Sequence, residues 1–202
     1  MSSTIKLPEK PTPIVPERIN EPDGSVIEAF HLPTDAESLE ALLRDVFDNH
    51  WQEISFGPLI QGAAWEIQAP CAPTRIGMMD GYITIAFGSS HFHICIGQHK
   101  GMPNRPASEA LAKHRRTSRA FIYRQLDQDG APISWGIRLF NGRDEQQINI
   151  LLPNPFLSTE TDKILKKPEW SHLALWDRLR ARWLGATEPD PFDRSAEKFR
   201  HG

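Results

Sequence analysis

The residues whose types and spacing favour chemistry gather in one short segment, His91-Phe-His-Ile-Cys-Ile-Gly-Gln-His99. Its alternation of polar and apolar residues indicates a β-strand, in which side chains two positions apart project to the same side with Cα atoms roughly 6.6 Å apart. His91, His93 and Cys95 therefore share one side of the strand. Two imidazoles at that spacing can bind one metal ion if a further ligand comes from another segment.

The spacing favours His91 and His93 as the central pair of ligands, with His99 reaching back from the loop that follows. His91 and Cys95 lie roughly 13 Å apart along a strand, too far to bind one ion together, so Cys95 would then lie beside the ligands or act as a reactive thiol. The alternative ligand set is His93, Cys95 and His99. Imidazole ligands suit zinc or iron, and a Cys95 thiolate would favour zinc or copper(I). The structural alternative is a pair of half-exposed histidines that hydrogen-bond to carboxylates.

Basic residues follow this strand. Residues 98–124 hold seven Lys and Arg against one Glu, whereas residues 1–54 hold eleven Asp and Glu against four Lys and Arg. Arginine binds carboxylates and phosphates through paired hydrogen bonds, and we expect Arg138, with Arg124 of a neighbouring strand, to bind an anionic small molecule. The alternative is that the acidic half of the chain neutralises the basic residues. The net charge of −3 argues against binding to bulk nucleic acid.

The segment around the histidines resembles two families. His91-Phe-His93-Ile-Cys95 resembles the histidine-triad signature of nucleotide hydrolases and transferases, which implies that His93 attacks a phosphate, although Cys95 stands where the third histidine belongs. The His-x-His pair is also similar to the cupins, which implies a metal-binding antiparallel barrel. Gly88 lies three residues before the pair, where the cupin motif has a glycine at six, and the next glutamate is Glu109.

The elements that must position these residues are mainly strands. Capping-box spacing after Thr34 and a helical repeat of leucines predict a helix that ends near His50. Two further helices are predicted over 108–116 and from about 168 to a cap at Gly185. Period-two alternation and tight turns predict strands over 53–56, 63–68, 75–79, 82–87, 91–96, 118–127, 133–140 and 146–152. The predicted fold class is α+β, an antiparallel meander or partly closed barrel of about eight strands, packed by two to three helices.

Strand alternation sorts the side chains onto two faces of the predicted sheet. One face is apolar and is expected to pack against the helices: Trp65, Ile67, Ile83, Ile85, Phe87, Phe92, Ile94, Ile96, Ile133, Trp135, Ile137, Leu139, Ile148, Ile150 and Leu152. The other is expected to form a sheltered polar surface, where a ligand would bind: Glu66, Gln68, Thr84, His91, His93, Cys95, Ser134, Arg138, Gln147 and Asn149. Gly136 on the polar face leaves room for a ligand or marks a bulge.

The length of 202 residues suits one domain. Prolines mark residues 1–22 as an N-terminal tail, residues 23–185 form a single α+β domain, and 186–202 form a polar C-terminal tail. Two cysteines make no disulfide framework, and neither a membrane-spanning run nor a secretory signal is apparent, so the expected location is cytoplasmic.

The sequence therefore predicts a small soluble metal-binding protein that holds zinc or iron on His91, His93 and His99. It would orient an anionic small molecule with Arg124 and Arg138, and an enzyme that acts on this molecule is one form of the prediction. Glu66 or His93 would transfer protons. The first alternative is a non-catalytic carrier or sensor of a nucleotide or tetrapyrrole such as haem, with Trp65, Trp135 and Phe140 as an apolar wall. The second is a scaffold protein that uses its tails. Substrate, reaction type and oligomeric state are not encoded in any motif.

Overall fold

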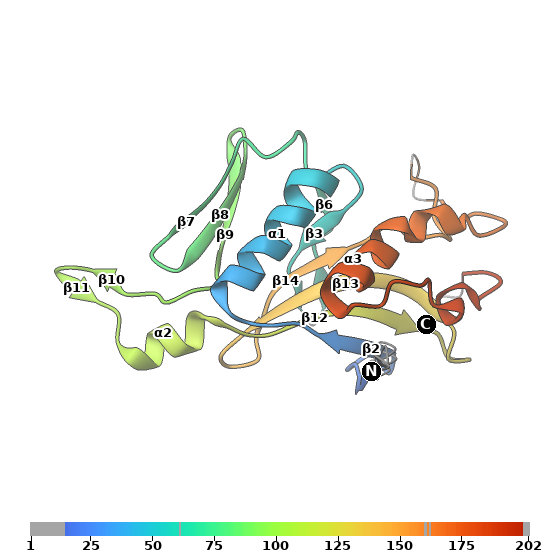
Figure 1. Ribbon diagram of the computed structural model, residues 1–202, viewed down its shortest axis with the longest axis horizontal. Coiled ribbons are helices and arrows are strands. Elements are labelled where there is room, and N and C mark those ends of the chain that lie inside the picture. Colours follow the sequence, from blue (N-terminus) through green and yellow to red (C-terminus); the bar gives the residue numbers. More distant parts are fainter. Residues whose placement is uncertain (1–14, 61, 160, 162, 200–202) are drawn as a thin grey trace, which may run out of the picture.

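The computed structural model describes residues 15–60, 62–159, 161 and 163–199. Its largest part is an open antiparallel sheet of seven strands in the order β1-β2-β12-β13-β14-β3-β6 (Figure 1). The predicted α+β fold with an antiparallel sheet is confirmed. The seven strands are Glu17–Asn20 (β1), Val26–His31 (β2), Thr117–Leu126 (β12), Pro132–Asn141 (β13), Gln146–Leu151 (β14), Ser55–Gly57 (β3) and Ile67–Gln68 (β6).

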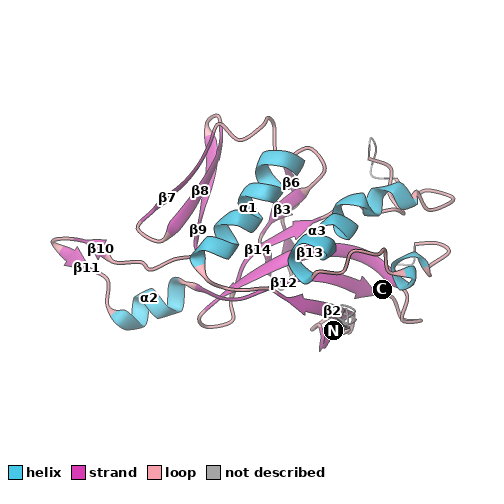
Figure 2. Cartoon of the chain, viewed as in Figure 1, coloured by secondary structure: helices cyan, strands magenta, loops and turns pink. Residues whose placement is uncertain are grey.

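The remaining strands form three separate antiparallel sheets, so the predicted polar face is divided. Strands β3, β6, β12, β13 and β14 belong to the large sheet, whereas the histidine strand belongs to a three-stranded one (Figure 2). Tight turns join the three strands, and Asp80 and Gly81 both have positive φ, as a two-residue hairpin turn requires. The smaller sheets are Arg75–Met79 (β7), Tyr82–Phe87 (β8) and Ser90–Cys95 (β9); Leu59–Ile60 (β4) and Ala63–Ala64 (β5); and Gly101–Met102 (β10) and Arg105–Pro106 (β11).

Three α-helices accompany the sheets: Ala36–His50 (α1), Glu109–Arg115 (α2) and Ala174–Leu184 (α3). The cap of α1 is Asp35, whose side chain accepts from the Ser38 N–H, so the helix begins one residue later than Thr34 would set it. The last helix begins as a 3₁₀ turn, Trp170–Leu173 (η1), and ends at the predicted cap Gly185. None of the helices in the described residues has both the length and the apolar character needed to cross a membrane.

Helices α1 and α3 cover one face of the large sheet, and the main core lies beneath them (Figure 1). The apolar sets predicted for residues 83–96, 133–139 and 148–152 join this core or pack against it, except for Ile133, which is buried outside it. Trp65 and Ile67 do not: they are 46% and 48% exposed, because this part of the chain forms only a two-residue strand at the edge of the sheet. The prediction that they pack against the helices is wrong.

Both predicted tails overlap ordered structure. Residues 1–14 lie outside the described residues, but Glu17–Asn20 of the proposed N-terminal tail form the edge strand β1. The proposed C-terminal tail contains a 3₁₀ turn, Pro191–Arg194 (η2), and buries Asp193 and Ala196 against the domain. The described part of residues 186–202 is therefore docked on the fold.

A buried ion-pair network fastens η2 to the sheet. Arg124 of β12 donates to Glu28 of β2 at 2.8 Å, to Asp190 at 2.8 Å and to Asp193 at 2.9 Å. Asp193 is fully buried, and it also accepts from the indole nitrogens of Trp135 and Trp176. Because a buried carboxylate is costly without such partners, this network constrains how the C-terminal segment packs.

We expect Arg124→Met to destabilise the fold strongly, because the buried Asp193 carboxylate loses the guanidinium that donates to it at 2.9 Å and keeps only the more distant Arg180, at 3.8 Å. Loss of one partner of a buried ion pair typically costs about 3–5 kcal/mol of unfolding free energy, measurable by urea denaturation. The matched control is Arg18→Met, because Arg18 also pairs with Glu28 but its side chain is 62% exposed. The control should change stability by less than about 1 kcal/mol; equal effects of both substitutions would contradict this account.

The same network predicts a dependence of stability on pH. Burial raises the pKa of Asp190, but hydrogen bonds from Arg124 and from the Phe192 N–H outweigh burial and hold the pKa below its ordinary value. A carboxyl group with a depressed pKa in the folded state stabilises the fold above its unfolded pKa, about 3.9, and that contribution is lost as the pH falls through the folded value. Wild type should therefore exceed Asp190→Asn in unfolding free energy at pH 7, and the difference should shrink below about pH 4. If the difference in unfolding free energy between the two proteins is the same at pH 3 and pH 7, this account of Asp190 is wrong.

Candidate functional site

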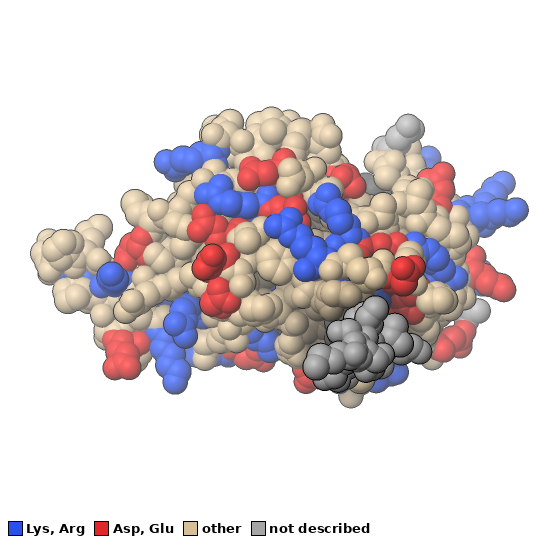
Figure 3. Space-filling view, viewed as in Figure 1, with Lys and Arg blue, Asp and Glu red and all other residues tan. Residues whose placement is uncertain are grey.

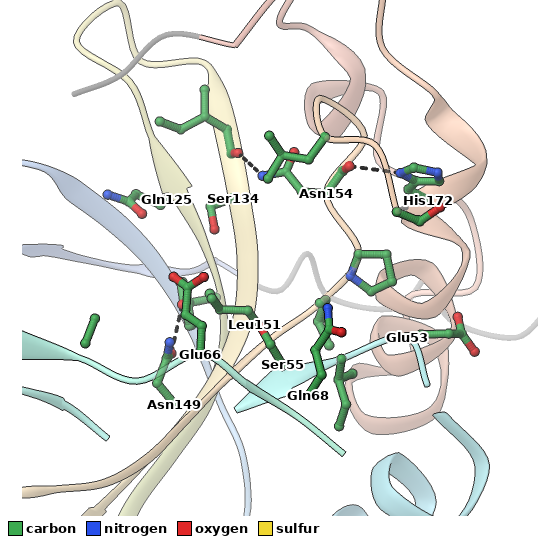
Figure 4. A pocket seen from close by; sticks show the side chains of 18 of the residues that line it. Glu53, Ser55, Glu66, Gln68, Gln125, Ser134, Asn149, Leu151, Asn154 and His172 are labelled. Atoms are coloured by element: carbon green, nitrogen blue, oxygen red, sulfur yellow. Dashed lines mark hydrogen bonds between the residues drawn. The ribbon is translucent and has the colours of Figure 1, made fainter. Parts of the chain in front are cut away.

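A cavity of about 670 Å³ lies on the face of the large sheet opposite the main core (Figure 4). Strands β12, β13 and β14 supply its floor, the segment 52–68 supplies one wall, and the segment 153–172 with Phe199 supplies the other. The volume falls in the range of small-molecule sites. Five residues of the predicted polar face line it together: Glu66, Gln68, Ser134, Arg138 and Asn149.

Three side chains from adjacent strands form the polar floor. The Tyr123 hydroxyl donates to Asn149 Oδ1 at 2.9 Å, and the Arg138 guanidinium lies 4.5 Å from the centre of the Tyr123 ring. Arg138 Nε contacts the same Asn149 oxygen at 3.4 Å, and Nη1 donates to Glu21 Oε2 at 2.8 Å. Because these contacts fix all three side chains, the floor is already ordered before any ligand arrives.

Gly136 makes this arrangement possible. It pairs with Tyr123 across β12 and β13, and a Cβ atom at Gly136 would lie 2.6 Å from Tyr123 Cε1 and 2.7 Å from the Ile150 carbonyl oxygen. The Tyr123 ring therefore lies across the position that a side chain would fill. The room that the sequence predicts at Gly136 is occupied by Tyr123, whose hydroxyl thereby reaches Asn149.

A second close approach shapes the wall. The β4–β5 hairpin folds back so that the Trp65 N–H donates to the Pro58 carbonyl at 3.1 Å, and a side chain at Gly57 would overlap the Trp65 backbone. This turn places Trp65 and Glu66 at the cavity, and Figure 4 shows the Glu66 carboxylate on the side of Gln125 and Ser134. Trp65, which is poorly placed for a core, thus lines the candidate site.

The electrostatics of the floor favour a stable cation. Burial lowers the pKa of Arg138, but interactions with Tyr123 and Glu21 raise it by more than burial lowers it. The pKa therefore lies above its ordinary value, and the guanidinium stays charged. Burial likewise raises the pKa of Tyr123, with Arg138 opposing, so its phenol stays protonated and donates. Arg138 is only 5% exposed, whereas the two cavity carboxylates, Glu53 and Glu66, are exposed.

Arg124 does not share this face. Arg124 projects from the same side of β12 as Ala120 and Ile122, which belong to the main core. Its guanidinium is buried on this helix-covered side, in the network with Asp193. The expectation that Arg124 and Arg138 converge on one ligand is therefore not met. Trp135 is likewise buried in the main core, so it does not form one apolar wall with Trp65.

Three of the predicted metal residues, His91, His93 and Cys95, lie on the three-stranded sheet, and His99 lies in the loop after it; none of them lines the cavity. His91 and His93 project from the same side of β9 as predicted, with ring centres 5.0 Å apart, but both are exposed. No residue of β7, β8 or β9 lines the cavity, so His93 and Glu66 belong to different sites. Across the part of the chain that the structure describes, no three His, Cys, Asp or Glu side chains are grouped closely enough to hold a metal ion.

His99 and Cys95 are engaged in other contacts. His99 Nδ1 lies 2.8 Å from Asp80 Oδ2, and its Nε2 lies 3.0 Å from Arg115 Nη1. Because a guanidinium can only donate, Nε2 accepts from Arg115. Cys95 is 3% exposed, and burial raises the pKa of its thiol above the ordinary value. The structure thus places His99 and Cys95 in a packed cluster and not in an open ligand position.

Several arginines form ion pairs with acidic side chains. Figure 3 shows Lys and Arg intermixed with Asp and Glu over α1 and α3, where Arg178 and Arg182 both contact Asp45. Arg138 and Arg124 pair with Glu21 and Glu28 of the acidic N-terminal region. Within the basic stretch 98–124, Arg124 pairs with Glu28 of residues 1–54 as the alternative predicts, whereas Arg119 pairs with Asp144 of a neighbouring turn.

Sequence reasoning missed Tyr123, Gln125 and His172 as cavity residues. The first two could have been found: Ala120, Ile122 and Leu126 mark one parity of their strand as apolar, which assigns Tyr123 and Gln125 to the polar face. His172 lines the cavity because its Nδ1 lies 2.9 Å from the Asn154 carbonyl oxygen, a contact between distant segments that no pattern signals.

Comparison with known proteins assigns the chain to a family. A family model described as a family of unknown function, DUF7676, matches residues 16–185, which covers the strands and helices that build the cavity. No curated protein and no solved structure matches the chain.

We expect Gly136→Ala to disturb the cavity floor, because the added Cβ collides with the Tyr123 ring and with backbone. Forcing an extra methyl group into such a packed position typically costs about 1–3 kcal/mol of unfolding free energy, measurable by urea denaturation. Gly77→Ala is the matched control, since Gly77 also lies in a strand and a Cβ there would meet no atom within 4 Å. Equal stability of the two variants would show that Tyr123 does not depend on Gly136.

Proposed function

We propose that this chain, which belongs to the DUF7676 family of unknown function, binds a small molecule in the cavity over the large sheet. The small molecule bears a carboxylate or a phosphate. Arg138 is the residue that anchors the anionic group. Tyr123 and Asn149 hold the guanidinium in place, and Gln68, Gln125 and Ser134 supply hydrogen bonds to the remainder of the ligand.

The observation that carries this proposal is a charged guanidinium buried in the floor of a cavity. Within the described residues, Arg138 donates hydrogen bonds through Nε and Nη1, to Asn149 and Glu21. Nη2 is therefore the group that we assign to the ligand. Arg124 provides the contrast, because three carboxylates already surround it and it is not among the residues that line this cavity.

The two carboxylates at the cavity do not cancel this preference. A pair of unit charges 4 Å apart interacts by about 1 kcal/mol in water but about 4 kcal/mol in the intermediate environment of a partly buried site. Arg138 is buried, whereas Glu53 is exposed and lies 2.7 Å from His50 Nδ1. Because Glu21 already pairs with Nη1 of Arg138, the guanidinium attracts a ligand anion through its remaining donor Nη2, and Glu66 favours ligands whose far end is uncharged or cationic.

Several anionic ligands fit this description, and a nucleotide is one, because the exposed Trp65 ring could stack on a base while Arg138 holds a phosphate. A tetrapyrrole is less favoured. The histidine at the cavity, His172, contacts the Asn154 carbonyl through Nδ1 and Glu169 through Nε2, so axial ligation would break an existing contact. If the protein is an enzyme, Glu66 is the cavity carboxylate that we assign to proton transfer.

The test is a thermal-shift and calorimetric titration of the full chain with three probes: inorganic phosphate, citrate and adenosine monophosphate. A ligand at one hundred times its dissociation constant stabilises the folded state by about 2.7 kcal/mol, enough to raise the melting temperature by several degrees. We expect at least one probe to do so, and Arg138→Met to lose at least tenfold in affinity.

Two further variants separate binding from folding. Ser134→Phe fills the cavity without touching the guanidinium and should also abolish binding, whereas Arg119→Met, which removes an arginine paired with Asp144 outside the cavity, should bind as wild type does. Binding that survives both Arg138→Met and Ser134→Phe would place the ligand elsewhere. Absence of binding of all three probes to wild type would count against an anionic ligand.

A further inference from the structure

We propose that His91 and His93 form a two-imidazole site for a divalent transition-metal ion on the outer face of β9, separate from the cavity. The site takes a smaller set of ligands than the sequence suggests, because His99 and Cys95 are held by other contacts. The chemical class of the ligand is a copper(II), nickel(II) or zinc ion, all of which accept neutral imidazole.

The backbone places the two rings together. His91 and His93 are two residues apart on β9, their ring centres are 5.0 Å apart, and the ring planes meet at 70°. Metal–nitrogen distances of about 2.0–2.1 Å place two ligating nitrogens about 3 Å apart at a right angle around the ion. Small side-chain rotations bring one nitrogen of each ring to that separation, and both rings are exposed, so an ion reaches them without opening the fold.

A buried hydroxyl orients one of the rings. Thr84 on the adjacent strand is paired with His93, and its Oγ1 lies 2.8 Å from His93 Nδ1. Thr84 is 6% exposed, so its hydroxyl is held in place beneath the imidazole. A bound cation selects the tautomer in which Nδ1 donates to Thr84 and Nε2 carries the lone pair, which is the way metal-bound histidines are commonly oriented.

Repulsion from a nearby cation is small. Arg75 is the charged residue of β7 that shares this face, through the pairing of Arg75 with Ala86 and of Ala86 with His91. It is therefore two strands away, about 10 Å, and exposed, so salt screens most of its effect at physiological ionic strength. Two protein ligands leave the remaining positions to water, which predicts weaker binding than at a closed three- or four-ligand site.

The experiment is a calorimetric titration of the full chain, free of any histidine tag, with copper(II), nickel(II) and zinc salts in turn. We expect one equivalent of copper(II) to bind most tightly, following the general order of divalent affinities. His91→Ala and His93→Ala should each weaken binding at least tenfold, and the double variant should lose the site. Thr84→Val should weaken binding by about tenfold while leaving both imidazoles present.

Matched controls are His31→Ala and His114→Ala, because each removes a histidine, one exposed and one half-buried, that lies within 2.7 Å of a glutamate away from β9. Both should bind as tightly as wild type, and melting temperatures should show that all variants are folded. A double variant that binds copper(II) as tightly as wild type would overturn the proposal, as would a loss of binding caused by either control. Neither result would bear on the cavity, whose test uses different probes and residues.

Discussion

Two-residue alternation along the central parts of β12, β13 and β14 is the constraint on which the fold and the cavity both depend. These three central strands carry an aliphatic and aromatic set on one face, which α1 and α3 cover, and Tyr123, Ser134, Arg138 and Asn149 on the other. Because a shift of one residue would exchange the two faces, the burial of the core also fixes which polar side chains meet at the cavity.

The two central arginines show how position in such a sheet decides what an identical side chain does. Arg124 and Arg138 are both almost fully buried, and each would be costly without compensation. Arg124 is surrounded by Glu28, Asp190 and Asp193 and holds η2 to the sheet, so its hydrogen bonds serve the fold. Arg138 has one carboxylate partner and borders a cavity, which leaves part of its hydrogen-bonding capacity for a ligand.

The two candidate sites are built on different principles. The cavity depends on close backbone and ring approaches at Gly57 and Gly136, which bring segments distant in sequence over one sheet face. The histidine pair depends on the pleat of a single strand and on one hydroxyl of its neighbour. The first is a tertiary arrangement with an ordered floor, and the second is a local one that needs only β9 and β8.

Hydrophobic alternation and turn residues were enough to predict the α+β class, most strands, the cap at Gly185, and the polar character of Arg138, Asn149, Ser134 and Glu66, because these follow from local periodicity. His91 and His93 share a side for the same reason. Only the tertiary structure decided that the histidine strand pairs in its own sheet, that Arg124 is enclosed by acids from both ends of the chain, and that Trp65 lines a cavity. Those outcomes depend on pairing and packing between segments that are distant in sequence, and the local sequence of a strand does not determine which other strand it pairs with.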